Sequence, residues 1–166
     1  EVKDINMISR TILGSSRTKP YKVEGGVKQV KKNLERINCK YLVAIGGEDT
    51  LGVAAKLHKN GINVIGVPKT IDNDLSETDY TFGFDTAITR ASEAIRNLHT
   101  TAKSHHRVII VEVMGRHAGW MTLEAGIAGG AHAILLPEEE FDMNMLVKII
   151  KNRENKNKNY TIIATS

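Results

Sequence analysis

Residues 41–50 read YLVAIGGEDT and carry the clearest signal for the fold. Residues 41–45 are apolar, with β-branched and aromatic side chains among them, and predict a buried strand. The pair Gly46-Gly47 predicts the turn that ends this strand, and the residues after it predict a helix over 51–57. A strand, a glycine turn and a helix in this order are typical of βαβ units, so the stretch predicts an α/β protein.

The rest of the chain repeats this alternation. Short β-branched runs are separated by segments in which apolar residues recur every three or four positions, the spacing of a helix face. Pro68 is expected to end one strand because it cannot donate a hydrogen bond to a ladder. The pattern predicts a Rossmann-like open parallel sheet with helices on both faces, with residues 1–166 forming most of one α/β domain. The predicted strands are 41–45, 62–67, 108–113, 131–136 and 160–164, and the predicted helices are 27–37, 51–57, 87–98, 120–128 and 145–150.

The composition narrows the class of protein. The chain has 166 residues, 41% hydrophobic and 25% charged, which is typical of a folded globular protein. Its net charge of +4 favours anionic ligands, but aromatic residues are only 5% and do not alternate with a basic stripe, so nucleic acid is not an expected partner. One cysteine excludes an internal disulfide, and the apolar runs are too short to span a bilayer. We expect a cytoplasmic protein with no membrane segment and, because the chain starts at Glu1 and ends on a strand pattern, a piece of a longer chain.

The loops that follow strands are the candidate sites, because ligands of open parallel sheets bind beyond the carboxyl ends of the strands. The first is Gly46-Gly47-Glu48-Asp49-Thr50, where glycine lets the backbone approach a ligand and a helix start attracts an anion. Two adjacent carboxylates would repel a bare phosphate unless a divalent cation such as Mg²⁺ lies between them. The alternative is a tight turn whose acidic residues suit the helix dipole.

The loop over residues 68–75, PKTIDNDL, places an ammonium group, a hydroxyl and carboxylates directly after a strand. That set can hold a phosphate, bind a metal and accept a proton. The alternative is an Asx-rich turn in which Asp72, Asn73 and Asp74 cap the following helix.

The loop over residues 114–119, MGRHAG, presents Arg116 between glycines, which suits bidentate recognition of a phosphate or hydroxyl group. The alternative is an ordinary surface arginine. Arg107 precedes the same strand and lies at the opposite end of the sheet, where it is either a solvated charge or reaches the site of a neighbouring subunit. The histidines lack the helical spacing of a zinc hydrolase, and no Gly-x-Ser-x-Gly nucleophile turn is present.

Together these loops resemble those of the 6-phosphofructokinase family, in the family's order and along nearly the whole chain. The Thr-Ile-Asp-Asn-Asp and Met-Gly-Arg elements are highly specific, whereas the Gly-Gly-acidic loop is similar to one in NAD and lipid kinases. The matching elements are residues 13–17 (LGSSR), 46–50 (GGEDT), 70–74 (TIDND), 83–84 (GF), 111–116 (VEVMGR), 119 (G) and 128–130 (AGG).

The resemblance implies transfer of a phosphoryl group to the 1-hydroxyl of fructose 6-phosphate, with Mg²⁺ as cofactor. It implies that Asp72 is the base, that Thr70 positions the sugar or the moving phosphate, and that Arg17 neutralises charge growing on the phosphoryl oxygens. The other implied positions are Glu48, which matches the family's usual metal-binding aspartate, and Asp74 near metal and phosphates; Gly47 and Thr50 at the donor; Met114, Gly115 and Arg116 at fructose 6-phosphate; and Arg107 at its phosphate from a neighbouring subunit of a homo-oligomer.

Two positions bear on the phosphoryl donor. ATP-using members have glycine where this chain has Asp49 and Lys69, and diphosphate-using members resemble this chain. A carboxylate at position 49 would crowd and repel the α-phosphate of a nucleotide, whereas an ammonium at position 69 would hold a small, highly charged diphosphate. Opposite charges ~4 Å apart interact by about 4 kcal/mol at an effective dielectric of ~20, and about 1.4 kcal/mol changes a preference tenfold. We therefore expect diphosphate as donor, with an ATP-dependent enzyme as the alternative.

The chain also differs from the family at a position linked to regulation and in how much of the family's sequence it contains. His99 occupies the position of an effector-binding arginine in allosteric bacterial members, so nucleotide control is not expected even though Lys156 and Lys158 match basic effector positions. The family's amino-terminal phosphate-binding glycine loop is absent, and the chain stops before later substrate-binding residues, so the isolated segment is expected to be inactive. A non-catalytic regulatory subunit is disfavoured because the implied base and substrate arginine are present. An NAD or lipid kinase would explain only the Gly46-Gly47 loop.

Overall fold

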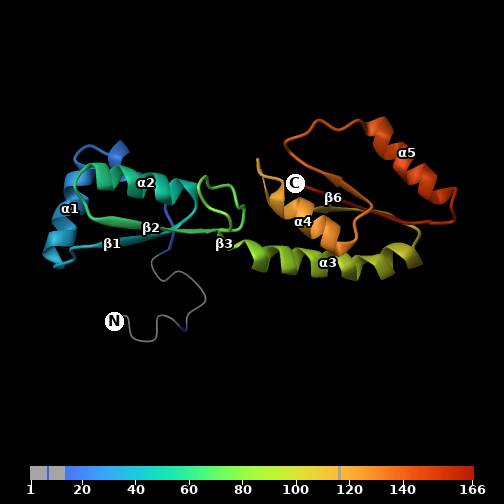
Figure 1. Ribbon diagram of the computed structural model, residues 1–166, viewed down its shortest axis with the longest axis horizontal. Helices are drawn as coiled ribbons and strands as arrows, with labels where there is room; N and C mark the ends of the chain where they lie inside the picture. Colours follow the sequence, from blue (N-terminus) through green and yellow to red (C-terminus); the bar gives the residue numbers. More distant parts are fainter. Residues whose placement is uncertain (1–6, 8–13, 116) are drawn as a thin grey trace. The chain divides into compact units, whose positions relative to one another are not determined.

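The computed structural model describes residue 7, residues 14–115 and residues 117–166 (Figure 1). The chain divides into two compact units, Glu1–Ala44 with Gly52–Gly66, and Ile45–Leu51 with Val67–Ser166. The loop that carries the Gly-Gly-acidic motif and all the later predicted loops therefore belong to the second unit. None of the helices in the described ranges is long and apolar enough to cross a membrane.

The first unit is built around β1 and the helices beside it in sequence. Val27, Val30 and Leu34 are spaced as one helix face and are all partly buried, as the sequence predicts. β1 is not the fully buried strand expected from its composition, because Val43 and Ile45 are 57% and 60% exposed and only the alternate residues are covered. The elements here are the 3₁₀ helix η2 (Pro20–Lys22), α1 (Gly26–Arg36), β1 (Leu42–Gly46), α2 (Glu48–Lys59) and β2 (Val64–Thr70), of which β1, α2 and β2 contribute residues to both units.

The end of β2 corrects one prediction. The strand continues through Pro68 to Thr70 and pairs in parallel with β3 (Phe82–Gly83), with Lys69 opposite Phe82 and Thr70 opposite Gly83. Pro68 precedes the paired positions, so its missing N–H takes nothing from the ladder with β3. β3 was not predicted because so short a strand shows no alternation. The strand order of this sheet is β1-β2-β3.

The second sheet is parallel, with strand order β4-β6-β5. α3 packs on α4, both helices contact β6, and α5 lies on the other side of that strand (Figure 1). The prediction of parallel strands with helices on both sides is confirmed, although the strands are divided between two sheets. α5 extends to Glu154, four residues beyond the end of the helix predicted over 145–150. The elements are α3 (Phe84–Ser104), β4 (Val108–Glu112), α4 (Trp120–Gly129), β5 (Ala133–Leu135), α5 (Met143–Glu154) and β6 (Thr161–Thr165).

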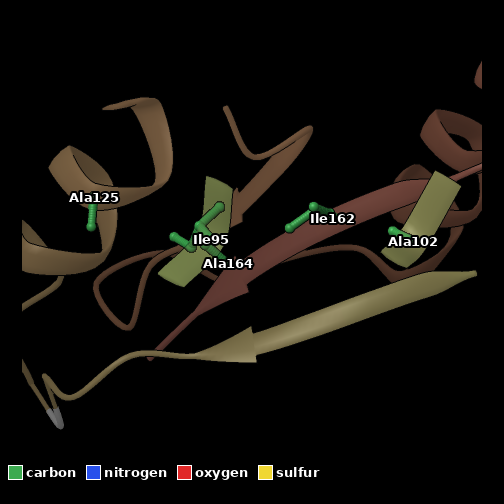
Figure 2. Packing of buried hydrophobic residues seen from close by; sticks show 5 residues of the cluster. All are labelled: Ile95, Ala102, Ala125, Ile162 and Ala164. Carbon is green, nitrogen blue, oxygen red and sulfur yellow. The ribbon is translucent and has the colours of Figure 1, made fainter. Parts of the chain in front are cut away.

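The core of the second unit lies between α3, α4 and β6. Figure 2 shows its buried residues, which come from all three elements and are 0% exposed: Ile95, Ala102, Ala125, Ile162 and Ala164. Burying one isoleucine side chain contributes about 1.5–3 kcal/mol, so Ile95 and Ile162 are large terms in this core. Glycines in α4 let the layers approach closely: a Cβ at Gly126 would lie 2.8 Å from Ile134 Cδ1, and a Cβ at Gly129 would lie 2.7 Å from Ile95 Cβ.

Candidate functional site

The Gly-Gly-acidic loop packs directly against the end of β2. A Cβ at Gly47 would lie 3.3 Å from Thr70 Cβ, so the Thr70 side chain occupies the space beside Gly47 that a side chain there would need. A Cβ at Gly46 would lie 2.5 Å from Thr50 Oγ1, which leaves no room for any residue but glycine in this turn. α2 begins immediately afterwards, and the N–H groups of a helix's first turn point outward, where they attract anions. The loop is thus a tight turn at a helix start. The predicted phosphate site and its alternative, an acidic turn that suits the helix dipole, would both have this geometry.

Thr70 holds Asp72. The Thr70 hydroxyl donates a hydrogen bond to Asp72 Oδ2 at 3.1 Å and accepts one from the Asp72 backbone N–H at 3.3 Å. Both residues are partly buried. One carboxylate oxygen of Asp72 is thus fixed by a neighbouring hydroxyl, which orients the other.

Asn73 closes the rest of this loop. Its side-chain oxygen accepts from the Thr81 N–H at 2.9 Å, and its amide donates to the carbonyl of Asp79 at 3.2 Å. The Thr81 hydroxyl in turn donates to the carbonyl of Thr70 at 2.8 Å. The alternative in which the Asp-Asn-Asp run caps the next helix is wrong, because α3 starts from Gly83 with no side-chain cap. Asn73 supports the loop, and Asp72 and Asp74 do not cap α3.

The charged residues predicted for the donor and metal are exposed. Glu48 and Asp49 occupy the first turn of α2, and Asp74 lies two residues beyond Asp72. Lys69 is exposed and precedes Thr70 in β2, so its side chain leaves the strand on the opposite face. The loop that carries Glu48 therefore lies next to Thr70, whereas the Lys69 side chain leaves β2 on the opposite face.

A small apolar cluster joins the Thr70 loop to the loop after β4. Ile71, between Thr70 and Asp72, packs against the buried residues Phe84, Val113 and Met121. Val113 immediately precedes Met114, and Met121 lies in the first turn of α4. The predicted catalytic and sugar-binding loops are therefore supported by one cluster.

The loop from Met114 to Gly119 is a tight turn. Gly115 has φ +154°, a Cβ there would lie 2.4 Å from the carbonyl oxygen of Ala118, and the Ala118 N–H donates back to the Gly115 carbonyl at 3.2 Å. Met114 is 68% exposed, and Trp120, the first residue of α4, is 52% exposed. Arg116 lies outside the described residues.

One residue of this site was missed from the sequence. The Gly119 N–H, at the start of α4, donates to Oε1 of Glu138 at 2.7 Å. Glu138 follows β5. The only sequence signal for its loop is its place after the strand predicted over 131–136. The run Glu138-Glu139-Glu140 gives no signal for a particular partner, since the donor lies far away in the sequence.

Arg107 lies at the other end of β4, as predicted. Its carbonyl accepts from the Thr161 N–H at 3.1 Å, and its side chain is exposed. At a rise of roughly 3.3 Å per residue, Arg107 and Met114 are about 20 Å apart, so they cannot share a site within one chain. Arg17 is exposed in the first unit.

His99 and His132 form a polar cluster with Tyr160 that the sequence did not predict. His99 Nε2 lies 2.9 Å from the Gly129 carbonyl and so carries the proton, and its Nδ1 lies 3.3 Å from the Tyr160 hydroxyl. His132 Nδ1 accepts from the Ile162 N–H at 2.9 Å. Burial, followed by the charges of Arg153, His99 and Lys158, lowers the pKa of His132 to about 4, so its ring is neutral at pH 7. Within the described ranges, no three or more His, Cys, Asp and Glu side chains are grouped so that they could hold a metal ion.

These features define a class of protein. A parallel α/β fold that gathers a glycine-lined helix start, a hydroxyl and an oriented carboxylate after its strands is suited to transfer of phosphate groups. The chain belongs to the phosphofructokinase family, whose family profile matches residues 1–166.

The relatives include users of both donors. The chain is 60% identical over 153 residues to a pyrophosphate–fructose 6-phosphate 1-phosphotransferase of Amycolatopsis mediterranei, covering 92% of this chain and 45% of the relative. It is 53% identical over 156 residues to an ATP-dependent 6-phosphofructokinase of Corynebacterium efficiens, covering 94% and 45%. The chain thus spans a little under half the length of these relatives.

Solved structures agree on the fold. The pyrophosphate-dependent phosphofructokinase from Marinobacter aquaeolei superposes with a TM-score of 0.81 and 29% identity, covering 94% of this chain and 42% of that one. The phosphofructokinase from Saccharomyces cerevisiae gives a TM-score of 0.79 and 30% identity, covering 93% and 24%.

Proposed function

We propose that the whole protein carrying this chain transfers a phosphoryl group from diphosphate to the 1-hydroxyl of fructose 6-phosphate, giving fructose 1,6-bisphosphate and phosphate. The observation that carries the proposal is the position of Thr70 next to Gly47, because the same threonine holds Asp72. A donor bound at the helix start of α2 would therefore lie beside the carboxylate that serves as base.

Asp72 is the proton acceptor in this proposal. Its Oδ2 is occupied by the Thr70 hydroxyl, so Oδ1 is the atom that takes the proton of the sugar 1-hydroxyl. As that O–H bond breaks, the sugar oxygen forms a bond to the transferred phosphorus, and the bridging P–O bond of diphosphate breaks to release phosphate. Thr70 fixes the carboxylate before reaction, which lowers the cost of orienting it in the transition state.

The donor set of the two loops fits Mg²⁺. Glu48 and Asp74 supply exposed carboxylates, and Mg²⁺ in phosphoryl-transfer sites commonly takes one or two carboxylates together with phosphate oxygens. Once bound, the ion would neutralise charge on the donor phosphates.

The substrate residues belong to the same proposal. Met114, Gly115 and Arg116 would contact fructose 6-phosphate, and Arg17 would stabilise charge on the moving phosphoryl group. The position of Arg107 at the far end of β4 supports a role in a neighbouring subunit, and hence a homo-oligomer.

Diphosphate is preferred over ATP on the residues at positions 49 and 69. Relatives named for either donor reach 53% identity, so overall identity does not separate the two. Relatives with 58–60% identity are named for pyrophosphate, which supports the same donor here. The exposed Asp49 carboxylate at the helix start would repel a longer nucleotide polyphosphate. Lys69 is assigned to the donor from the resemblance to diphosphate-using members. Its side chain leaves β2 on the face opposite to Thr70, so its ammonium group would reach a donor beside Thr70 only through its long, flexible side chain.

The donor assignment is tested on the full-length protein with fructose 6-phosphate, Mg²⁺ and either donor. We expect turnover with diphosphate to exceed turnover with ATP, and Asp49→Gly with Lys69→Gly to lower kcat/KM for diphosphate by about tenfold, the equivalent of ~1.4 kcal/mol. The KM for fructose 6-phosphate is the internal control and should stay nearly constant. Faster turnover with ATP would establish the ATP-dependent alternative, and no turnover with either donor would favour a regulatory subunit.

A further inference from the structure

The loop that carries Met114, Gly115 and Arg116 is held at both of its ends. At the strand end, the Val113 N–H donates to the carbonyl of Thr165 at 2.7 Å. At the helix end, the Gly119 N–H donates to Glu138 Oε1 at 2.7 Å. Between these two anchors, Gly115 adopts a backbone conformation that few other residues tolerate.

Glu138 replaces the cap that α4 lacks. The residue before the helix, Gly119, has no side chain to accept an N–H, and the first turn of α4 contains no acidic residue. The Glu138 carboxylate, supplied from the loop after β5, provides both the hydrogen-bond acceptor and the negative charge that a helix start favours.

The fit between the two residues is close. A Cβ at Gly119 would lie 2.6 Å from Glu138 Oε2, 2.9 Å from Pro137 Cδ and 3.0 Å from Leu136 Cδ2. The loop after β5 thus fills the space beside Gly119 that a side chain there would need. A movement of the Glu138 carboxylate would be transmitted to the start of α4 and to the turn that precedes it.

We propose that Glu138 is a positioning residue for sugar-phosphate recognition: it fixes the Gly119 N–H and thereby the neighbouring hydrogen bond between Ala118 and Gly115. This inference rests on the proposed function. Glu138 does not itself contact the reacting groups in this assignment, and the atoms nearest to a Cβ at Gly47 in the donor loop all belong to Thr70. Its loss should therefore act on fructose 6-phosphate and leave the donor nearly unaffected.

The test uses the full-length protein and the variants Glu138→Ala, Glu138→Gln and Glu139→Ala. Loss of a charge-assisted hydrogen bond should raise the KM for fructose 6-phosphate about tenfold in Glu138→Ala, with kcat and the KM for diphosphate within about threefold of the parent. Glu138→Gln keeps an oxygen that accepts the Gly119 N–H and should recover most of the affinity. Glu139→Ala removes the neighbouring exposed carboxylate and should behave as the parent.

Calorimetric binding of fructose 6-phosphate without donor gives a readout that is independent of turnover. A parent protein that neither binds the sugar phosphate nor turns over would overturn the proposed function. A parent that does both, alongside a Glu138→Ala variant with parental affinity, would overturn only the positioning role. So would a Glu138→Ala variant that weakens both substrates and kcat equally. If Glu138→Ala fails to fold, Glu138→Asp withdraws the carboxylate by one methylene group, and an unchanged affinity in that variant also counts against the inference.

Discussion

Thr70 is the residue at which two loops of the candidate site meet. Its side chain lies next to Gly47 and hydrogen-bonds to both the carboxylate and the N–H of Asp72. The types and order of these residues could be predicted from the sequence, because a glycine turn and a Thr-x-Asp pair each have a recognisable local chemistry. Their mutual contact could not, since it depends on how β1 and β2 are aligned.

Replacing the Thr70 hydroxyl tests its role in orienting the base. Thr70→Val keeps the shape but removes the donor to Asp72 Oδ2, so we expect kcat of the full-length enzyme to fall by roughly tenfold or more. Thr70→Ser keeps the hydroxyl and is the matched control, with kcat expected to remain within a few-fold. Steady-state kinetics with saturating substrates provide the comparison, and equal rates in the two variants would contradict the role.

Glu138 shows why some site residues escape sequence reasoning. Its partner, the Gly119 N–H, is a backbone group on another loop, and the bond forms only because β4 and β5 both flank β6 in one sheet. No local spacing reports such a contact. The proposed role of Asp72 comes from its local Thr-Ile-Asp-Asn-Asp pattern, whereas the contact of Glu138 with the start of a distant helix has no such pattern.

At the scale of elements, the long helices and most strands were predictable from the sequence, but β3 and the end of β2 were not. The apolar spacing of α1, α3 and α4 depends on local periodicity, so their positions agree within a few residues at most boundaries. β3 and the continuation of β2 past Pro68 depend instead on pairing between distant segments. The expected full burial of β1 was wrong for a similar reason, because the covering of a strand's second face is not encoded in the strand itself.

Glycine has opposite consequences in two helices. A Cβ at Gly129 would lie 2.7 Å from Ile95 Cβ, in the packed contact between α4 and α3, so Gly129→Ala should destabilise the protein by about 1–3 kcal/mol. Gly52, within α2, has nothing within 4 Å of an added Cβ, so Gly52→Ala should stabilise by about 0.5–1 kcal/mol through helix propensity. Urea unfolding of both variants measures the two free energies, and the same sign for both would contradict the packing argument.

At the scale of the whole molecule, the second unit has an apolar core and a separate polar cluster formed by His99, His132 and Tyr160. The cluster lies where β6 begins, whereas the candidate site lies where the strands end. His132 accepts the Ile162 N–H and lies within 5.5 Å of the rings of His99 and Tyr160, centroid to centroid. The division of the chain into two units could not be predicted from composition or periodicity, and the assignment of residues 1–166 to most of one domain stays a prediction.

The His132 cluster predicts acid sensitivity. Its pKa is about 4 in the folded protein against an ordinary value of 6.5, so between these two pH values the unfolded chain binds more protons. The contribution of His132 to stability is therefore complete above pH ~6.5, declines as the pH falls towards 4, and changes little below that. Protonation at Nδ1 would also remove the acceptor for the Ile162 N–H.

The unfolding midpoint in urea at a series of pH values tests this. His132→Asn supplies a side-chain oxygen to the same N–H but does not titrate, so its loss of stability between pH 6.5 and 4 should be smaller than that of the parent. An equal pH dependence in the two proteins would assign the acid sensitivity to other groups.

Trp120 gives this site an optical property. It is the one tryptophan in the 166 residues, it is half-exposed, and it follows Gly119 at the start of α4. Because indole emission depends on the polarity of its surroundings, a ligand that binds beside the start of α4 would change the wavelength and intensity of its fluorescence. The chain therefore carries an intrinsic fluorophore next to Gly119, where Glu138 binds. Binding of fructose 6-phosphate near this loop could be followed in real time without a dye.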